Sequence, residues 1–527
     1  MRYNKFPVSL AVLFLFLATA SVMPQVTQSL RMEYDETQQD AASKIAVDTQ
    51  GNIFICGNSS DNQGVRLVTT KYDAAGNVVW RKKYRGPAFE DRVAGIELDA
   101  AGNCYVGGYS EGTDGVFHFL LIKYAAATGD SLFVKRKVKT GEAHFFCRDS
   151  QGNFYLGGDE MNSGTFSYAL VKYSPQGDSL WTAYHSGSSI RTIDTDPAGN
   201  IYVSGDVFSN TCHTIKYNSS GVQQWANTTT LFMGPSPLGM RLIKCDAPGN
   251  TYVTGFRYVN STTREDIVLL KYNTAGALEW ERRFINDGRN DYANGLTIDN
   301  AGNIIVAGNS YDPSSGNYDL LILKYNPSGD LAWSRFFPKS EPHSMKPARV
   351  ICDAQNNIYA AGGTTQNFVV KYNGLGDTLW STFTNGSGTG GLNAFADMVL
   401  DDAGNIYCAG NVKNLAGGSD MITIKYTQST VGIVNQNNSA TGFSLSQNYP
   451  NPFNPSTAIE FAVLHTGVVK LFVFDYAGRE IETLVNGNLN AGNYAVSWNA
   501  SGYASGVYFY KLTAGNFSEV RKMILIK

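Results

Sequence analysis

The sequence predicts an all-β protein, with an eight-bladed β-propeller (seven blades being the alternative) followed by a small immunoglobulin-like β-sandwich. A two-part pattern recurs eight times between Ile45 and Tyr426, with a period of about 50 residues. Each unit carries four short strand signals, which is the content of one propeller blade. After residue 442, new alternating apolar segments separated by turn residues indicate the sandwich.

The amino terminus has the composition of a secretory signal peptide. Arg2 and Lys5 precede an apolar run that ends in the small residues Ala18-Thr19-Ala20. The run is shorter than the ~20 residues that a membrane-spanning helix needs, which weakens the alternative of an uncleaved anchor. We predict a cleaved signal over residues 1–20 and no membrane span after cleavage.

The first part of each repeat is an apolar strand followed by Asp-x-x-Gly-Asn, with Asn356 replacing the glycine in the seventh repeat. Aspartate accepts hydrogen bonds from turn amides, and Gly or Asn tolerates positive φ, so the motif predicts a hairpin turn. One carboxylate per repeat is too few oxygen donors for a calcium loop. We therefore predict a structural role for the motif aspartates. They are Asp48, Asp99, Asp149, Asp196, Asp246, Asp299, Asp353 and Asp401.

The second part of each repeat is Lys-Tyr, a turn containing Gly, and then Trp, as in Lys71-Tyr72, Gly76 and Trp80. It predicts the third strand, a turn and the outermost fourth strand of a blade. The second repeat has Phe133 in place of Trp, so this position requires a large aromatic side chain rather than an indole.

The eighth repeat lacks its fourth strand, because no Trp follows Lys425-Tyr426. Residues 30–34 have the pattern of the missing strand, and Tyr34 precedes Ile45 by nearly the spacing that separates Tyr84 from Ile96. We predict that this amino-terminal strand completes the last blade and closes a ring over residues 29–426.

The two hairpin signatures, recurring in order over residues 29–426, resemble the bacterial β-propeller repeat family abbreviated SBBP. The resemblance implies a β-propeller. Members of that family are named for seven blades, which is why a seven-bladed ring stays as the alternative to our count of eight.

Composition and motifs exclude several function classes. The chain has 42 basic and 45 acidic side chains, so it has no broad basic field to bind nucleic acid. The seven cysteines are scattered through the repeats and favour buried thiols over disulfides. The six histidines occupy unrelated repeat positions, and no phosphate loop, zinc spacing or nucleophile motif occurs. We therefore expect no metal, no cofactor and no enzymatic activity.

Residues 427–442 form a polar linker, and residues 443–527 begin a new module with Tyr449-Pro-Asn-Pro-Phe453. With the Asp475–Arg479 turn, the Ala504–Tyr510 segment and the basic apolar end, the module resembles a type A carboxy-terminal sorting domain of type IX secretion. The resemblance implies recognition by the type IX machinery and delivery to the outer cell surface or the medium. The matching sorting residues are Tyr449, Pro450, Asn451, Pro452, Phe453, Gly478, Arg479, Gly506 and Lys527.

Ligand binding is expected where the repeats differ. The repeated turns share one face of the propeller, and the variable segments share the other, with aromatic and polar side chains suited to glycan or protein contact. The candidates are Phe117, Phe232, Tyr258, Arg264, Tyr292, Tyr311, Tyr318 and Phe395. Three polar residues of the first strands, Glu97, Asp194 and Lys244, either line the central channel or make satisfied contacts between blades.

The function predicted from these patterns is that of an exported, non-enzymatic binding or scaffold protein. It is expected to be a monomer with an extracellular glycan or protein ligand. One alternative is an extracellular propeller lyase or hydrolase acting on polysaccharide or peptide. Another is a structural cell-surface protein.

Overall fold

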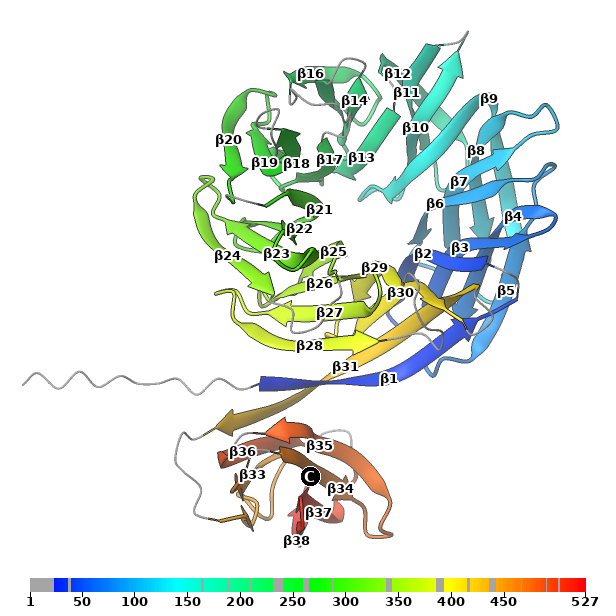
Figure 1. The fold of residues 1–527 in the computed structure, drawn as a ribbon. Helices are drawn as coiled ribbons and strands as arrows, with labels where there is room; N and C mark the ends of the chain where they lie inside the picture. The colour runs from blue at the N-terminus through cyan, green and yellow to red at the C-terminus, as the bar shows by residue number, and fades with distance from the viewer. Residues whose placement is uncertain are drawn as a thin grey trace, which may run out of the picture. The chain divides into compact units, whose positions relative to one another are not determined.

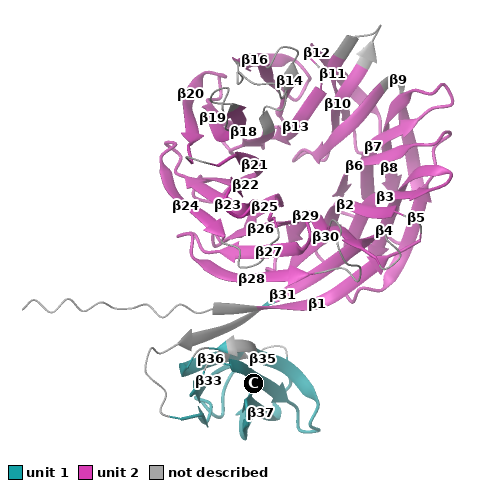
Figure 2. Ribbon diagram, in the orientation of Figure 1, with its two compact units in different colours: residues 1–25, 428–527 teal, residues 26–427 magenta. Residues whose placement is uncertain are grey.

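The computed structural model describes residues 23–36, 39–162, 165–187, 189–207, 211–230, 240–258, 265–286, 289–337, 344–384, 393–414, 418–435, 442–465, 467–489, 491–500 and 503–527. The predicted signal peptide therefore lies outside the described residues. The chain divides into two compact units, residues 26–427 (unit 2) and residues 1–25 with 428–527 (unit 1), coloured separately in Figure 2. Strands are the regular elements throughout, and no helix occurs among the described residues, so none is available there to cross a membrane.

Unit 2 consists of antiparallel groups of four strands arranged around a ring (Figure 1). The first groups are β2 (Gln39–Val47), β3 (Ile53–Asp61), β4 (Gly64–Tyr72) and β5 (Val78–Tyr84); then β6 (Asp91–Leu98), β7 (Cys104–Glu111), β8 (Phe117–Tyr124) and β9 (Ser131–Arg148). Strand β9 is long enough to continue into the next group, with β10 (Phe154–Asn162), β11 (Thr165–Tyr173) and β12 (Ser179–Ser186).

Four further groups form separate four-stranded sheets. They are β13 (Ser189–Thr195), β14 (Ile201–Val207), β15 (Thr211–Tyr217) and β16 (Gln223–Thr230); β17 (Met240–Cys245), β18 (Thr251–Tyr258), β19 (Glu265–Tyr272) and β20 (Leu278–Phe284); β21 (Asp291–Ile298), β22 (Ile304–Asp312), β23 (Asn317–Tyr325) and β24 (Leu331–Phe337); and β25 (Pro347–Cys352), β26 (Ile358–Gly363), β27 (Asn367–Tyr372) and β28 (Thr378–Thr384). The β-propeller architecture is confirmed, while the blade number stays a prediction.

The last group joins the two ends of unit 2. It contains β29 (Ala394–Leu400), β30 (Ile406–Lys413), β31 (Ser419–Asn435) and the amino-terminal strand β1 (Met23–Tyr34), which pairs with β31. Met32 and Tyr34 are buried in one cluster with Tyr407 and Met421. The predicted strand exchange is therefore confirmed. Strand β31 reaches Asn435, so it extends into the segment predicted as a linker.

The central strands of each group are buried on both faces, because each sheet packs between two neighbours. In β23, Leu321 and Leu323 pack toward the preceding group, whereas Leu320 and Ile322 pack toward the following one. This alternation of apolar side chains explains the continuous apolar runs at these strands. All seven cysteines are free thiols. Four of them are buried in central strands, namely Cys56, Cys104, Cys212 and Cys408, and the other three are partly buried in first strands.

A β-bulge recurs in the first strand of each group and explains the constant glycine of the second strand. In β9, the register passes from Phe145 opposite Gly157 to Ala143 opposite Gly158, leaving His144 as the extra residue. The bulge brings the carbonyl oxygen of Glu142 so close that a Cβ at Gly158 would collide with it. The same collision with backbone occurs at the equivalent glycines. These are Gly57, Gly108, Gly205, Gly308, Gly362 and Gly410.

Unit 1 is a small sandwich of two sheets. One contains β32 (Ser444–Leu445), β33 (Ser456–Val463) and β36 (Gly492–Asn499), and the carboxy-terminal end of β31 pairs with β36. The other has the order β35 (Glu480–Leu489), β34 (Gly467–Phe474), β37 (Gly506–Ala514) and β38 (Phe517–Leu525). Their inner faces enclose a core around Trp498, Leu471 and Tyr510. The immunoglobulin-like topology stays a prediction.

Candidate binding face and channel

The motif aspartates organise the repeated turns. Asp299 accepts hydrogen bonds from the backbone amides of Ala301 and Asn303, at 3.0 and 2.9 Å, and its Oδ2 lies 2.9 Å from Nζ of Lys324. The carboxylate is fully buried and the Lys324 side chain is 8% exposed. The aspartate thus caps its own turn and pairs with the lysine of the Lys-Tyr motif in the same group.

A tyrosine six residues after the aspartate completes this arrangement in most repeats. The hydroxyl of Tyr202 donates to Asp196 at 2.9 Å, and Nζ of Lys216 lies 5.0 Å from the centroid of the Tyr202 ring. No role for this tyrosine was predicted from the sequence. The signal was its fixed spacing from the aspartate, since the other tyrosines occupy it at Tyr105, Tyr155, Tyr252, Tyr359 and Tyr407.

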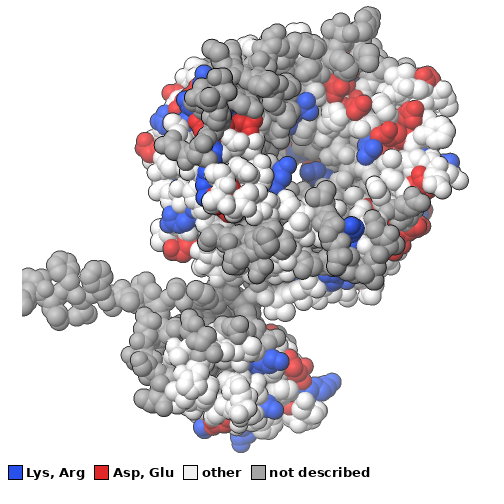
Figure 3. All heavy atoms as spheres, in the orientation of Figure 1, with Lys and Arg blue, Asp and Glu red and all other residues white. Residues whose placement is uncertain are grey.

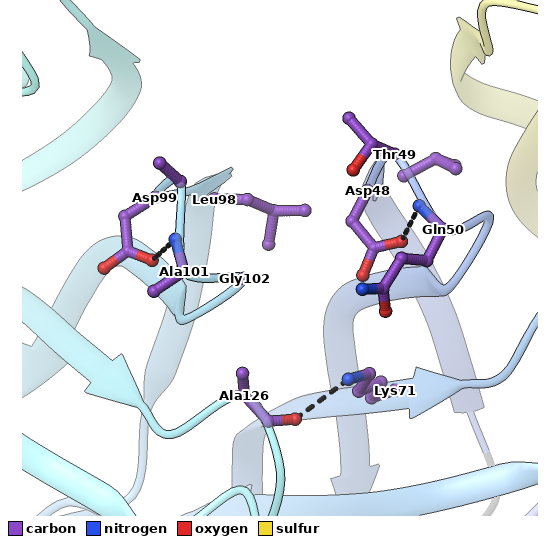
Figure 4. A pocket seen from close by; sticks show the side chains of 11 residues that line it. Asp48, Thr49, Gln50, Lys71, Leu98, Asp99, Ala101, Gly102 and Ala126 are labelled. Atoms are coloured by element: carbon purple, nitrogen blue, oxygen red, sulfur yellow. Dashed lines mark hydrogen bonds between the residues drawn. The ribbon is translucent and has the colours of Figure 1, made fainter.

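The second motif bridges neighbouring groups. Trp80 Nε1 and Lys71 Nζ both donate to the carbonyl of Ala126, at 3.1 and 2.9 Å. A pocket of about 300 Å³ lies above this contact, between the turns of Asp48 and Asp99 (Figure 4). Its charged side chains already bond the surrounding turns, so the pocket belongs to the scaffold and we assign it no ligand.

Several first strands carry charged residues toward the middle of the ring. Lys244 Nζ lies 2.8 Å from Asp194 Oδ1, while the amide of Cys245 donates to Asp194 Oδ2 at 2.9 Å. Basic atoms border the hollow in the middle of unit 2 in Figure 3. Of the three predicted channel residues, Asp194 and Lys244 are thus a direct pair that bridges β13 and β17.

Glu97 keeps limited water contact but is surrounded by protein. Burial raises its pKa from 4.5 to about 7, although Arg148, Arg349 and Lys244 lower it. Because the folded pKa lies above the ordinary value, protonated Glu97 favours folding. Its contribution to stability is complete below pH ~4.5 and is lost as the pH rises through 7.

Replacing Glu97 by Gln is therefore expected to raise the melting temperature by a few degrees at pH 8 and to change it little at pH 5. Thermal unfolding at the two pH values measures the difference, with the exposed turn variant Asp402→Asn as the control. Equal effects of Glu97→Gln at both pH values would contradict the raised pKa.

Three of the predicted binding residues converge on the variable face. The ring centroids of Tyr292 and Tyr318 are 6.2 Å apart, and those of Tyr311 and Tyr318 are 5.2 Å apart. Phe256, which is buried, packs edge to face on Tyr292 at 5.3 Å. The residues come from β18, β21, β22 and β23, so the cluster spans two neighbouring groups. We call these four residues the aromatic cluster.

An ion-pair network borders the aromatic cluster. Arg289 Nη1 lies 2.7 Å from Asp319 Oδ2, and Nη2 lies 3.5 Å from Asp312 Oδ2. The backbone of Tyr311 donates to the carbonyl of Asn290 at 2.8 Å, which ties the end of β22 to the start of β21. The three tyrosines are only partly buried, and the Arg289 guanidinium lies 5.5 Å from the centroid of the Phe336 ring.

The remaining predicted binding residues fare differently. Phe117 packs on Tyr109, with ring centroids 5.2 Å apart. The prediction that Phe395 is a binding residue is wrong, because Phe395 lies in β29 opposite Gly410 and is 1% exposed. The backbone of Tyr258 pairs with Glu265 at the end of β18. Phe232 and Arg264 lie outside the described residues.

A polar cluster that was not predicted from the sequence lies at the strand ends on the variable face, on β7, β9, β10 and β13. His144 Nε2 is 2.8 Å from Asp159 Oδ1, and Ser189 Oγ donates to that oxygen at 3.2 Å. The side chains of Glu142 and Tyr109 are hydrogen-bonded. The pKa of Tyr109 is raised, mainly by burial and to a smaller extent by the negative charge of Glu142. These five residues form the acid–base cluster.

A second unpredicted contact joins two histidines. His185 Nε2 and His213 Nδ1 are 2.9 Å apart, so these two histidines meet although they occupy unrelated positions of their repeats. Burial lowers the pKa of both. Among the residues that the structure describes, no three His, Cys, Asp or Glu side chains are grouped to hold a metal ion.

The sorting residues of unit 1 tie its first segment to its last strand. The amide of Phe453 donates to Ile524 O and Ile526 donates to Phe453 O, both at 3.0 Å, while the Phe453 ring is buried. Asn451 Oδ1 accepts from the Ile524 amide at 2.9 Å. Tyr449 is 83% exposed beside Pro450 and Pro452.

The other sorting residues occupy turns and strand ends. Gly478 has φ +78° in a turn that Arg479 closes on Asp475, with Nε 2.7 Å from Oδ2. Gly506 begins β37, and the amide of Lys527 donates to Ser505 Oγ at 2.9 Å. The sequence motif is thus mainly a set of turn and strand-end residues that close the module.

Comparisons with known proteins support both parts of the chain to different extents. No curated protein matches the sequence significantly. Sqt1 from Chaetomium thermophilum is similar over 76% of this chain and 99% of its own length, with TM-score 0.50 and 13% identity. The polysaccharide lyase Uly1 is similar over 75% and 91%, with TM-score 0.40 and 11% identity. The likeness to Sqt1 concerns the fold alone, and the finer likeness to SBBP repeats stays a prediction.

Residues 447–527 match the family described as the secretion system C-terminal sorting domain. The match coincides with the module whose closing contacts are given above and confirms the predicted sorting domain. The chain therefore ends in a C-terminal sorting domain that directs its export by type IX secretion to the cell surface or the extracellular space.

Proposed function

We propose that the exported protein is a non-enzymatic binding protein that holds an extracellular glycan or protein on the variable face of its propeller. The observation that carries this proposal is the aromatic cluster. Three partly exposed tyrosines from separate strands meet there beside the buried Phe256.

The chemistry of this surface suits a sugar or an amphipathic peptide. Tyrosine rings offer apolar faces to the C–H groups of a ligand and hydroxyls to its polar edge. Arg289 is held by Asp319 and Asp312, the residues that follow Tyr318 and Tyr311, so its guanidinium is fixed at the same strand ends before a ligand binds. A preorganised aromatic and polar surface on a rigid scaffold is typical of binding proteins.

The double variant Tyr292→Ala/Tyr318→Ala is expected to lose at least about tenfold in affinity, because two stacking rings are removed from one site. Glycan arrays and titration of the resulting hits with the mature protein measure this loss. Leu375→Ala, which truncates an exposed side chain on the repeated-turn face, serves as the matched control. Unchanged binding by the tyrosine variant would contradict the proposal.

The acid–base cluster favours a second candidate, an extracellular lyase or hydrolase acting on polysaccharide or peptide. A histidine bonded to a carboxylate and a tyrosine bonded to another are groups that transfer protons. Turnover of an extracellular polymer that is lost in His144→Gln and kept in His213→Gln would establish this candidate. Binding without turnover by both variants would support the non-enzymatic function.

A further inference from the structure

The outer side of the sheet β35-β34-β37-β38 in unit 1 combines exposed apolar and basic side chains. Val469, Leu471 and Tyr510 are buried in the core of the sandwich. Because side chains alternate along a strand, the intervening residues point to the opposite face. On β34, β37 and β38 these include Val468, Lys470, Phe472, Phe474, Val507, Phe509, Lys511, Val520, Lys522 and Ile524.

The strand register gathers these residues into one surface. Phe474 lies opposite Phe509, which in turn lies opposite Lys522. Two residues further along the same face, Phe472 lies opposite Lys511. The rings of Phe472 and Phe474 have centroids 6.4 Å apart. We call the three phenylalanines together with Lys470, Lys511 and Lys522 the basic aromatic patch.

Fold stability alone does not account for the basic aromatic patch. A solvent-facing side of an antiparallel sheet is ordinarily polar, yet Val520 and Val507 are 54% and 38% exposed beside it. Lysines commonly protect edge strands from pairing with other chains. Only Lys522 lies on the edge strand β38, whereas Lys470 and Lys511 lie on the inner strands β34 and β37.

The size and charge of this surface indicate its kind of partner. Three strands at ~4.8 Å spacing and eight residues at ~3.4 Å give a face of roughly 400 Å². That area is small for a stable complex and suits a transient one, as a sorting signal requires. The patch has three lysines, and the acidic Glu480 lies at its margin, opposite Phe474 on the neighbouring strand. The Glu480 carboxylate accepts a hydrogen bond from the Thr483 hydroxyl at 2.9 Å.

We propose that the basic aromatic patch is the surface by which the sorting domain docks on a protein component of the type IX machinery, whose own surface is acidic and apolar. The inference deepens the sorting role of residues 447–527 by naming the docking surface. The phenylalanines supply the desolvated contact, and the lysines select an acidic partner and speed its encounter.

The test is export of the full chain in a type IX-competent bacterium, measured as the ratio of surface and medium protein to periplasmic protein. We expect Lys470→Glu/Lys511→Glu/Lys522→Glu and Phe472→Thr/Phe509→Thr each to lower that ratio at least about tenfold. The conservative Lys470→Arg/Lys511→Arg/Lys522→Arg variant should be exported normally. So should Asn516→Ala, which truncates an exposed side chain in the turn between β37 and β38, outside the patch.

Thermal unfolding of unit 1 in each purified variant shows whether that variant is folded. Normal export of the folded Lys→Glu variant would overturn the proposal. Failure of the wild-type chain to be exported would overturn the sorting role itself, which makes the two failures distinguishable. Binding of the wild-type chain, but not of the Lys→Glu variant, to vesicles of equal parts phosphatidylcholine and phosphatidylglycerol would assign the patch to a lipid surface instead.

Discussion

Removal of residues 21–38 is expected to lower the stability of the whole propeller and not only that of its last sheet. Strand β1 fills the outer place beside β31, and Ser29 Oγ donates to the carbonyl of Lys425 at 3.2 Å. The deletion exposes an edge of β31 and uncovers the core around Met32 and Tyr34. Burial of two such side chains stabilises by about 3–6 kcal/mol in total.

The loss should spread because each sheet is packed between two others. Thermal unfolding of the mature chain and of the truncated chain measures it, with a variant that lacks only residues 1–22 as the control. Each kcal/mol lost from the free energy of unfolding lowers the melting temperature by about a few degrees. We therefore expect the truncated chain to melt at least about ten degrees lower. Coincident unfolding curves for the two chains would refute closure of the ring by strand exchange.

The repeat made most of this fold predictable from sequence. A fixed period forces every unit into the same turns, so Asp299 and Gly302 could be assigned to a hairpin without knowledge of the neighbours. The missing fourth strand was also predictable, because a ring of sheets leaves an open edge unless another segment fills it. These inferences depend on local chemistry and on counting.

The bulge in each first strand was not predictable, and it decides where several side chains lie. Its extra residue interrupts the alternation of faces, so counting back from the motif aspartate fails beyond that point. Phe395, predicted as a binding residue at the end of a variable segment, lies instead opposite Gly410 just before the bulge. The apolar residues Ala42, Val93 and Ile190 at equivalent places were the available signal.

The candidate sites escaped sequence reasoning because their side chains come from different strands and, for Tyr109, Ser189 and Phe256, from neighbouring groups. His144 is itself the extra residue of a bulge, and Asp159 reaches it from the neighbouring strand. Tyr292 and Tyr318 were predicted separately as binding residues, but their approach depends on the register of β21, β22 and β23 within one sheet. Spacing along the sequence does not reveal the bulges and the strand register that create such contacts.

Replacing Asp299 by Ala is expected to cost about 3–5 kcal/mol, the usual effect of removing one partner from a buried ion pair. Lys324 would keep its charge in a site that excludes water, and the turn amides of Ala301 and Asn303 would lose their acceptor. Urea unfolding measures the change. Asp330→Asn, in the exposed turn before β24, is the control and should lie within about 0.5 kcal/mol of the wild type.

The pH dependence and a double variant separate the two roles of Asp299. Burial opposes ionisation of this carboxyl, but hydrogen bonds from Asn303 and Lys324 outweigh it and hold its pKa below 3.8. Its contribution is therefore present above the unfolded pKa and is lost as the pH falls through the lower folded value. Asp299→Asn keeps a turn acceptor but strands Lys324, so adding Lys324→Met should recover stability. A double variant no more stable than Asp299→Asn would show that turn capping, rather than the ion pair, is the main contribution.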